Sequence, residues 1–304
     1  MARILNFGSL NVDYVYHMDH FVLPGETLTS TARDVNCGGK GLNQSIAAAA
    51  SGAEVFHAGR IGRDGSMLTE MLNSRGVSTE LVELSDGPSG HAIIQVDRNG
   101  QNSIILFPGA NREIEPESIE HALEGFSSGD YLILQNEISR IPDIMKAAAE
   151  KGMKIVFNPS PITDDIASFP LELVDIFVLN EIEGAVLSGE NEPAEIIKVL
   201  RVKYPGALIL LTLGSDGSVL CGEDVFLTYG IHSAPVVDTT AAGDTMLGFF
   251  TGLLASGLGY EEALSTATKA AAITVSRKGA APSIPTLEEA RACPFPYVEF
   301  GGGV

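Results

Sequence analysis

Short apolar runs recur through this chain, and each is followed by polar residues and often by a longer helical pattern. The runs stand at 3–8, 55–58, 131–134, 154–157, 176–179 and 207–211. Their length is typical of buried strands, whereas the Ala-rich stretches after several of them have the length and periodicity of helices. Strands that alternate with helices predict an α/β fold, in which helices cover a mainly parallel sheet.

Two segments break this rhythm. Residues 12–36 contain a stretch in which apolar and polar residues alternate, and residues 89–109 contain two such strands around the turn at 97–100. Alternation of this kind is typical of half-exposed strands in hairpins. We therefore expect one domain over residues 1–304, with both segments forming a small β-sheet that acts as a lid over a site.

Composition and charge narrow the function. The 304 residues include 19 Lys and Arg against 39 Asp and Glu, for a net charge of −20. Nucleic acids and anionic membranes require clustered basic residues, so neither is an expected partner. The three cysteines lie far apart and form no metal-ligand spacing, and no apolar run is long enough for an export signal or a membrane span. We expect a cytoplasmic protein.

The stretch from Asp238 to Asp244 carries the strongest chemical indication. Small residues at 241–243 permit a tight turn, and an apolar helical run follows at once. The free N–H groups of a helix's first turn bind anions, and Asp244 among them could accept a proton from a hydroxyl. The alternative is an ordinary helix N-terminus, in which Asp244 only interacts favourably with the helix dipole.

Other polar residues follow predicted strands, where ligands of open α/β sheets bind. Asn11 and Asp13 follow the first strand, Glu137 follows another, and Asn43 lies in a glycine-rich segment, 38–44, that opens a helix. Each is a candidate contact to a small polar ligand, or else a turn or cap residue. The glycine-rich segment matches neither a Walker A loop nor a dinucleotide fingerprint.

Three further positions suggest a nucleotide and metal ions. Asn180 and Glu183 lie one helical turn apart and could reach Mg²⁺ or phosphate, or could cap a helix. The segment 212–217 offers hydroxyl and N–H groups to a nucleotide, or forms a simple turn. The loop 277–283 is rich in free carbonyls that could hold a monovalent cation, with Asp238 as the obvious carboxylate partner.

Two separated motifs identify a family. Gly38-Gly39-Lys40-Gly41-x-Asn43-Gln44 and Asp238-Thr239-x-Ala241-Ala242-Gly243-Asp244 resemble those of the ribokinases within the PfkB family of sugar kinases, and the similarity runs from Ile4 to about Glu289. The resemblance implies a three-layer α/β/α sandwich and ATP-dependent phosphorylation of a sugar, D-ribose at O5 above all. It also implies Mg²⁺, a monovalent cation such as K⁺, and a homodimer formed through the lid.

The resemblance implies a role for each candidate residue. Asp244 would be the catalytic base, and the backbone of Ala241, Ala242, Gly243 and Asp244 would form the anion hole. The sugar would contact Asn11, Asp13, Gly39, Lys40, Gly41, Asn43, Glu137 and Asp244. The nucleotide would contact Asn180, Glu183, Thr212, Gly214, Ser215, Gly217, Gly243 and Thr268. The monovalent cation would be held by Asp238, Thr240, Thr274, Arg277, Gly279 and Ser283.

The chain departs from the family pattern mainly in the lid. His91 replaces an apolar residue and could face the ligand, and Cys37 replaces a larger side chain. Both leave room for another sugar, such as fructose, tagatose or deoxyribose, or for a nucleoside. A sugar sensor without catalysis is a further alternative, which Asp244 and the glycine-rich segment disfavour. We expect the tail, 294–304, to be frayed.

Overall fold

The computed structural model describes residues 2–303, and its largest element is a nine-stranded sheet in the order β13-β12-β11-β10-β9-β8-β1-β4-β5. Strands from β11 to β5 are parallel to their neighbours, while β12 and β13 add an antiparallel edge. The strands are β1 (Ile4–Phe7), β4 (Val55–Ile61), β5 (Ser78–Leu84), β8 (Tyr131–Gln135), β9 (Lys154–Asn158), β10 (Ile176–Asn180), β11 (Leu208–Thr212), β12 (Ser218–Cys221) and β13 (Phe226–Tyr229).

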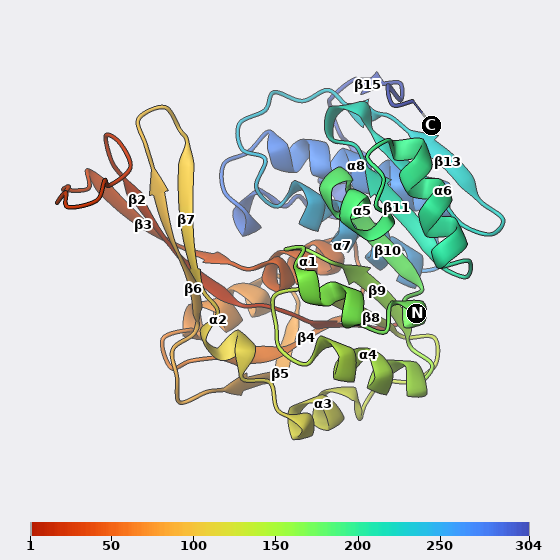
Figure 1. Ribbon diagram of the computed structural model, residues 1–304, viewed down its shortest axis with the longest axis horizontal. Coiled ribbons are helices and arrows are strands. Elements are labelled where there is room, and N and C mark those ends of the chain that lie inside the picture. Colours follow the sequence, from red (N-terminus) through yellow and green to blue (C-terminus); the bar gives the residue numbers. More distant parts are fainter. Residues whose placement is uncertain (1, 304) are drawn as a thin grey trace.

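Helices cover both faces of this sheet (Figure 1). Alternate residues of β1 show the two faces, because Ile4 packs with the first group of helices and Leu5 with the second. The first group is α1 (Lys40–Ala50), α2 (Ser66–Ser74), α7 (Ala242–Ala255), α8 (Tyr260–Val275) and α9 (Leu287–Arg291). The second is α3 (Pro116–Leu123), α4 (Ile141–Glu150), α5 (Glu181–Ser188) and α6 (Pro193–Lys203). The predicted three-layer α/β/α fold is confirmed.

A separate four-stranded sheet projects from the body, in the order β3-β2-β6-β7 (Figure 1). Its strands are β2 (Asn11–His17), β3 (Ala32–Gly38), β6 (Gly90–Val96) and β7 (Asn102–Phe107). The two hairpins join through β2 and β6, which are parallel. The strands predicted from alternation therefore form one sheet, called the small sheet below.

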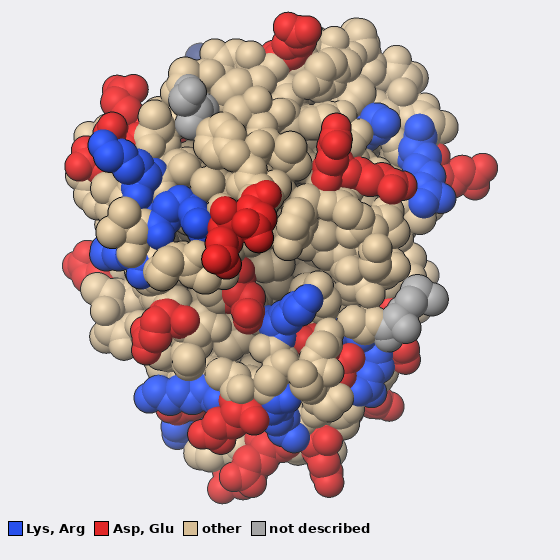
Figure 2. Space-filling view, turned by 90° about the vertical axis from the view of Figure 1, so that its right-hand side faces the viewer, with Lys and Arg blue, Asp and Glu red and all other residues tan. Residues whose placement is uncertain are grey.

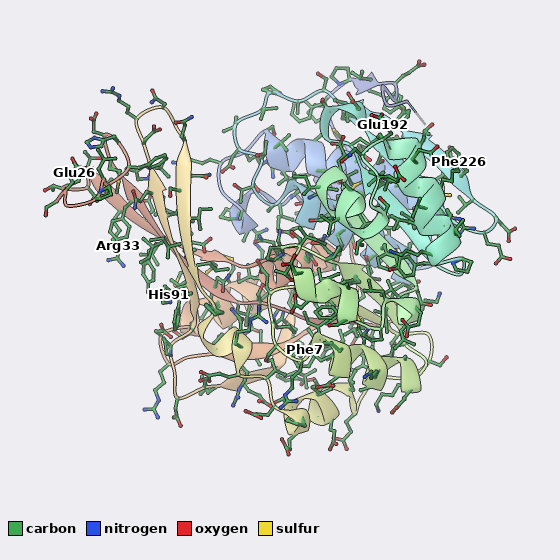
Figure 3. The ribbon with its side chains drawn as sticks, viewed as in Figure 1. Phe7, Glu26, Arg33, His91, Glu192 and Phe226 are labelled. Atoms are coloured by element: carbon green, nitrogen blue, oxygen red, sulfur yellow. The ribbon has the colours of Figure 1, made fainter. Side chains whose placement is uncertain are left out.

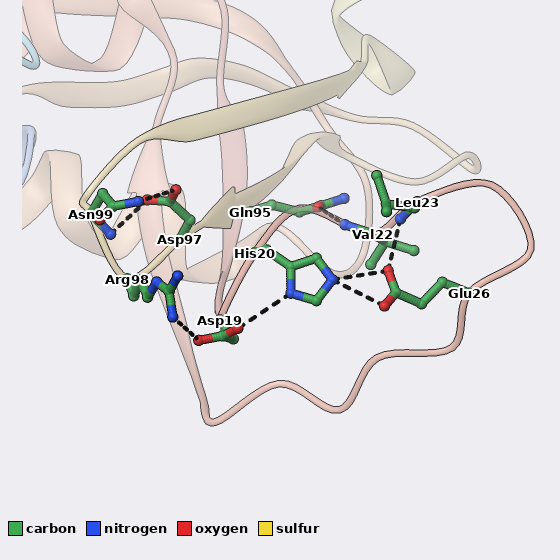
Figure 4. A network of polar contacts seen from close by, with 9 residues as sticks. All are labelled: Asp19, His20, Val22, Leu23, Glu26, Gln95, Asp97, Arg98 and Asn99. Atoms are coloured by element: carbon green, nitrogen blue, oxygen red, sulfur yellow. Dashed lines mark hydrogen bonds and ion pairs between the residues drawn. The ribbon is translucent and has the colours of Figure 1, made fainter.

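The far end of the small sheet, where Figure 3 labels Glu26, carries a network of charged side chains that we call the tip network: Asp19, His20, Glu26 and Arg98 (Figure 4). His20 contacts Glu26 at 3.0 Å and Asp19 at 3.4 Å, and Arg98 contacts Asp19 at 3.3 Å. These contacts join the loop after β2 to the turn between β6 and β7. Side chains such as His20, 45% exposed, remain in water.

Residues 294–303 of the tail are ordered rather than frayed, which corrects the expectation from sequence. Tyr297–Val298 (β15) pairs with Ile231–His232 (β14), and the N–H of Gly301 donates to the carbonyl of Asp216 at 3.0 Å. The tail is held because its backbone finds these partners and Tyr297 packs against Tyr229 and His232. It therefore lies against the segment 212–217.

The surface agrees with an acidic protein. In Figure 2 the basic side chains of one face lie among acidic ones. Within residues 2–303, every helix is too short or too polar to cross a bilayer. Short 3₁₀ helices complete the fold at Gly109–Arg112, Asp164–Ser168, Leu171–Leu173, Gly214–Asp216 and Ala281–Ser283.

Candidate active site

Amide side chains stand at or near the carboxyl ends of neighbouring strands of the large sheet. They are Asn6 on β1, Gln135 on β8, Asn158 on β9 and Asn180 on β10. Because parallel strands end at one edge, these side chains meet there, and Gln135 and Asn158 are in register. This edge faces the first turns of α1 and α7.

The first turn of α7 has the form that the sequence predicts. Ala241 precedes the helix with φ of 62°, a left-handed conformation that is uncommon for a residue other than glycine. The turn leaves the N–H groups of Gly243 and Asp244 without hydrogen-bond partners among residues 2–303, whereas that of Ala242 donates to Thr239 at 3.3 Å. Two free donors therefore lie beside the carboxylate of Asp244, which is 8% exposed.

Close packing of α1 against α7 brings two amides to Asp244. A Cβ atom at Gly248 would lie 2.5 Å from the Cβ of Ala47 and 2.7 Å from the carbonyl oxygen of Gln44. Only glycine fits at this crossing. Asn43 consequently donates from Nδ2 to Oδ2 of Asp244 at 3.0 Å, and Gln44 from Nε2 to Oδ1 at 2.8 Å.

The glycine-rich segment folds tightly over the end of β1. Gly39 has φ of 98°, and a Cβ atom there would lie 2.8 Å from the carbonyl oxygen of Ser9. Glu137 accepts from the N–H of Lys40 at 3.1 Å and from the hydroxyl of Ser9. Burial raises the pKa of Glu137, and the charge of Asp244 adds a smaller effect in the same direction.

The small sheet contributes Asn11 and Asp13 to this side of the site. Burial raises the pKa of Asp13 to about 7, and the charge of Glu137 acts in the same direction. Asn11 accepts from Nδ2 of Asn111 at 2.8 Å. Asn111 and Ser9 were missed in the sequence because neither stands in a motif. The one signal that could have found them is their position after a predicted strand.

A cavity of about 240 Å³ reaches Asp244, the first turn of α7 and Lys40. Its lining is Lys40, Asn158, Ser160, Val178, Leu179, Asn180, Glu183, Thr212, Thr239, Ala241, Ala242, Gly243 and Asp244. Burial alone would lower the pKa of Lys40, but the carboxylates of Asp244, Glu137 and Glu183 outweigh it, so the pKa is raised. A positive charge thus lines the same cavity as Gly243 and Asp244 of α7.

A second cavity of about 610 Å³ shares Thr212, Thr239, Ala242 and Gly243 with the first. The remaining lining is Gly214, Ser215, Gly217, Ser218, Gly230, Ile231, His232, Ser233, Ala234, Val236, Met246, Thr268, Ala271, Ala272 and Val275. The predicted nucleotide contacts on β11 and the loop after it thus line one space with Thr268 of α8. The largely apolar wall on α8 suits a flat ring.

Asn180 and Glu183 form a capping box at the start of α5. The side chain of Asn180 accepts from the N–H of Glu183, and the carboxylate of Glu183 accepts from the N–H and Nδ2 of Asn180 at 2.9 and 3.0 Å. The cap interpretation is therefore correct as structure. Both residues also line the smaller cavity, so the pair is available to a ligand as well.

The residues predicted for a monovalent cation lie at one end of α7. The carboxylate of Asp238 accepts from Thr240 and from the N–H of Gly279 at 3.0 Å, which joins the loop 277–283 to the start of the motif. The side chains of Thr274, Arg277 and Ser283 bind Thr245, Glu289 and the carbonyl of Ala280. Arg277 has no side-chain oxygen, so its contribution to a cation would come from its backbone carbonyl, an oxygen atom that suits such an ion.

His91 and Cys37 do not face the ligand side of the small sheet. Both are in register with Val12, whereas Asp13 is in register with Asn36 and Ala92. Neighbouring residues of a strand point to opposite faces. His91 packs instead beside Tyr14 and Phe107, so the expectation that it could face the ligand is wrong.

Comparison with known proteins gives consistent matches. The model of the "pfkB family carbohydrate kinase" matches residues 1–287. The ribokinase of Bacillus subtilis is 34% identical over 95% of this chain and 98% of its own. A bifunctional ribokinase/ribose-5-phosphate isomerase A of Fructilactobacillus sanfranciscensis is 34% identical over 95% of this chain, which spans 55% of that protein. The Arabidopsis thaliana ribokinase complexed with ribose and ATP superposes with a TM-score of 0.85, 30% identity and coverage of 96% and 99%.

Proposed function

Because this chain belongs to the pfkB family of carbohydrate kinases, we propose that its reaction is transfer of the γ-phosphoryl group of ATP to O5 of D-ribose. The chain is an ATP-dependent sugar kinase. The observation that carries the finer assignment is the joint position of Asp244, the free N–H groups of α7 and the strand-end polar groups. The products are ADP and ribose 5-phosphate.

Asp244 acts as the base in this proposal. Its oxygen atoms each accept one amide N–H bond, from Asn43 and Gln44, which orients the carboxylate and leaves lone pairs for a hydroxyl. The sugar hydroxyl gives its proton to Asp244 as its oxygen attacks the γ-phosphorus, and the bond to the β-phosphate oxygen breaks.

Charge on the transferring group is stabilised by two features. The N–H groups of Gly243 and Asp244 point from the start of a 14-residue helix, where the dipole favours anions. The ammonium group of Lys40, which lines the same smaller cavity, adds a full positive charge. Ala241 supports this arrangement through its left-handed turn.

We place the sugar between the glycine-rich segment and the small sheet. Asp13 can accept from two adjacent hydroxyls, and Asn11, Asn43 and Glu137 supply further polar atoms. Support comes from Asn43, whose Oδ1 is buried without a partner among residues 2–303 and thus suits a donor from the sugar. Gly39 and Gly41 let the glycine-rich segment pack closely against Ser9 and Gly8, which sets its backbone beside the proposed sugar site.

ATP fits the two cavities together, with its base in the larger and its terminal phosphate toward Gly243. Thr212, Gly214, Ser215, Gly217 and Thr268 line the larger cavity, and Asn180 and Glu183 line the smaller. Mg²⁺ bound to ATP would neutralise phosphate charge. Glu183, an oxygen donor at this end, would hold it through water.

The fit of a K⁺ ion rests on the chemistry of its proposed donors. Asp238 brings one carboxylate to the carbonyl-rich loop 277–283 by its bond from Gly279. Burial alone would raise the pKa of Asp238, but hydrogen bonds from Thr240 and Gly279 and the charge of Lys278 together outweigh it, so the pKa is lowered and the carboxylate stays charged. The ion would stabilise the turn that precedes α7.

A coupled ADP-release assay tests the proposal. Pentoses, deoxyribose, fructose, tagatose and nucleosides are compared, with K⁺ and with a large organic cation in its place. Ribose should give the highest kcat/KM, and ³¹P NMR should place the phosphate on O5. Higher activity with another sugar would reassign the substrate, and phosphorylation of none of them would support the sensor alternative.

We further propose that two copies pair through their small sheets. Ile104, Ile105, Leu106 and Phe107 of β7 are 46–60% exposed, an unusual run of apolar side chains for a solvated edge strand. Ile105→Lys should convert a dimer to a monomer by light scattering. Leu84→Lys, at an apolar residue of β5 that is 68% exposed, is the matched control.

A cytoplasmic location is the last part of the proposal. Cys37, Cys221 and Cys293 are all free thiols. Reduced cysteines are usual in a reducing compartment. Fractionation of cells that express the chain would test this location.

A further inference from the structure

A chain of buried amides leads from the glycine-rich segment to Asp244, and only its last member, Gln44, has been given a role above. Asn6 donates from Nδ2 to the carbonyl of Gly41 at 2.9 Å. Gln135 donates from Nε2 to Oδ1 of Asn6 at 2.9 Å and to Oε1 of Gln44 at 2.8 Å. Gln44 completes the chain with its 2.8 Å bond to Asp244. Asn6 and Gln44 are fully buried, and Gln135 is 1% exposed.

The direction of every amide in this chain follows from its first link. The carbonyl of Gly41 can only accept, so Asn6 must present its nitrogen there and its oxygen to Gln135. Gln135 must then present its nitrogen, which meets the oxygen of Gln44. Gln44 is left with its nitrogen toward Asp244, the only orientation that favours a carboxylate.

A second observation is that the side chain of Gln135 satisfies only half of its own hydrogen-bonding groups. Its Oε1 is buried and has no partner among residues 2–303, while its nitrogen makes both bonds. An unsatisfied buried oxygen destabilises the folded state. What the side chain provides in return is a fixed orientation of Gln44.

We propose that Gln44 is a positioning residue for Asp244 and that Gln135 selects the orientation of the Gln44 amide. The amide supplies a neutral N–H donor that stabilises the ionised carboxylate and holds it toward the sugar hydroxyl. Were Gln44 to invert, its oxygen would face the carboxylate of Asp244, and the two acceptors would repel each other. This inference rests on the proposed function of the site.

The test is a double-mutant cycle of Gln44→Met and Gln135→Met, which keep side-chain length and remove the donors. Each single variant should lower kcat about tenfold, leave KM for sugar and ATP within about threefold, and move the acidic limb of the kcat–pH profile upward by about one unit. Because Gln135 acts through Gln44, the double variant should be no slower than Gln44→Met alone.

Ser45→Ala is the matched control. Ser45 lies beside Gln44 on α1, is fully buried and bonds to His57 at 2.8 Å, away from Asp244. It should lower the melting temperature without moving the pH limb. The proposal would be overturned if the losses in kcat multiply in the double variant, or if the acidic limb of the kcat–pH profile does not move in Gln135→Met. If Gln135→Met does not fold, the acidic limb of Gln44→Met decides. The cycle uses whichever sugar the wild-type enzyme phosphorylates best, so a wrong substrate assignment is seen separately.

Discussion

The site around Asp244 and the tip network of the small sheet contain similar contacts in opposite surroundings. Gln44 lies 2.8 Å from Asp244, and His20 lies 3.0 Å from Glu26. The first pair is buried where strands and helices meet, whereas the second is on a loop in water (Figure 4). Contact distances alone therefore do not say which of the two networks matters more for catalysis.

The two networks differ in how deeply their side chains are buried. Polar groups that are removed from water must be satisfied by one another, so each member of the site has a fixed partner and direction. Charged groups at an exposed tip can exchange a partner for water at little cost. We expect substitutions in the site to change catalysis strongly and equivalent substitutions in the tip network to change little.

The largest effect tests the two regions at matched carboxylates. Asp244→Ala removes the proposed base and should lower kcat roughly 10³-fold or more, with the fold retained by circular dichroism. Asp19→Ala in the tip network should leave kcat unchanged. Steady-state ADP release measures both, and near-normal turnover by Asp244→Ala would refute the assignment of the base.

Asp13 gives the next effect, because it belongs to the small sheet but faces the site. With a pKa of about 7, it is mostly protonated at pH 6 and mostly ionised at pH 8. If the ionised form binds the sugar hydroxyls, KM for the sugar should fall about tenfold between these pH values. Asp13→Asn should raise KM and remove the pH dependence; a KM that is flat in the wild-type enzyme would contradict this.

The buried carboxylate of Asp13 should also lower the stability of the folded protein at high pH. A carboxylate whose folded pKa lies above its unfolded value of 3.8 binds protons more tightly when folded, so its contribution falls as pH rises from about 4 to 7. Asp13→Asn should therefore unfold at a higher temperature than the wild-type protein at pH 8. Calorimetry at pH 5 and pH 8 distinguishes this from a general effect, because the difference should shrink at pH 5.

The sequence predicts most of the fold because its core strands are continuous apolar runs. It missed β5, whose residues Ser78–Leu84 are partly exposed at the edge of the sheet and lack such a run. It also missed that β4 extends to Ile61, since Gly59 and Arg60 look like a turn until β5 pairs with them. An edge strand is stabilised by pairing with a neighbouring strand, and the local sequence pattern carries no information about that neighbour.

For the site, the sequence indicated the groups that stand in motifs. Asn43 bonds to Asp244, and Glu137 accepts from the N–H of Lys40; the roles of these residues are proposals. Asn6 and Gln135 could not be selected, because an amide at a strand end looks like many others until its partners are known. The tail was wrongly expected to fray because its hydrogen-bond partners, such as Asp216, are remote in sequence.

A smaller effect tests whether helix packing holds the site together. Gly248→Ala places a methyl group against the backbone of α1, which must move. We expect a loss of about 1–3 kcal/mol in the free energy of unfolding and a several-fold lower kcat, because Asn43 and Gln44 move with α1. Gly259→Ala, where the added atom meets open space, is the control for denaturant unfolding and kinetics.

The smallest effect belongs to His20→Gln, at the centre of the tip network. The hydrogen bond to Glu26, followed by that to Asp19, raises the pKa of His20, so its stabilising contribution is present below its unfolded value of 6.5 and is lost as pH rises through the folded pKa. Because these groups are exposed, the variant should keep the wild-type melting temperature at pH 8 and differ only slightly at pH 5.5. Its kcat and KM should match those of the wild-type enzyme at both pH values. A clear loss of activity at pH 5.5 would instead mean that the tip network controls the position of the small sheet, and burial would no longer explain the contrast between the two regions.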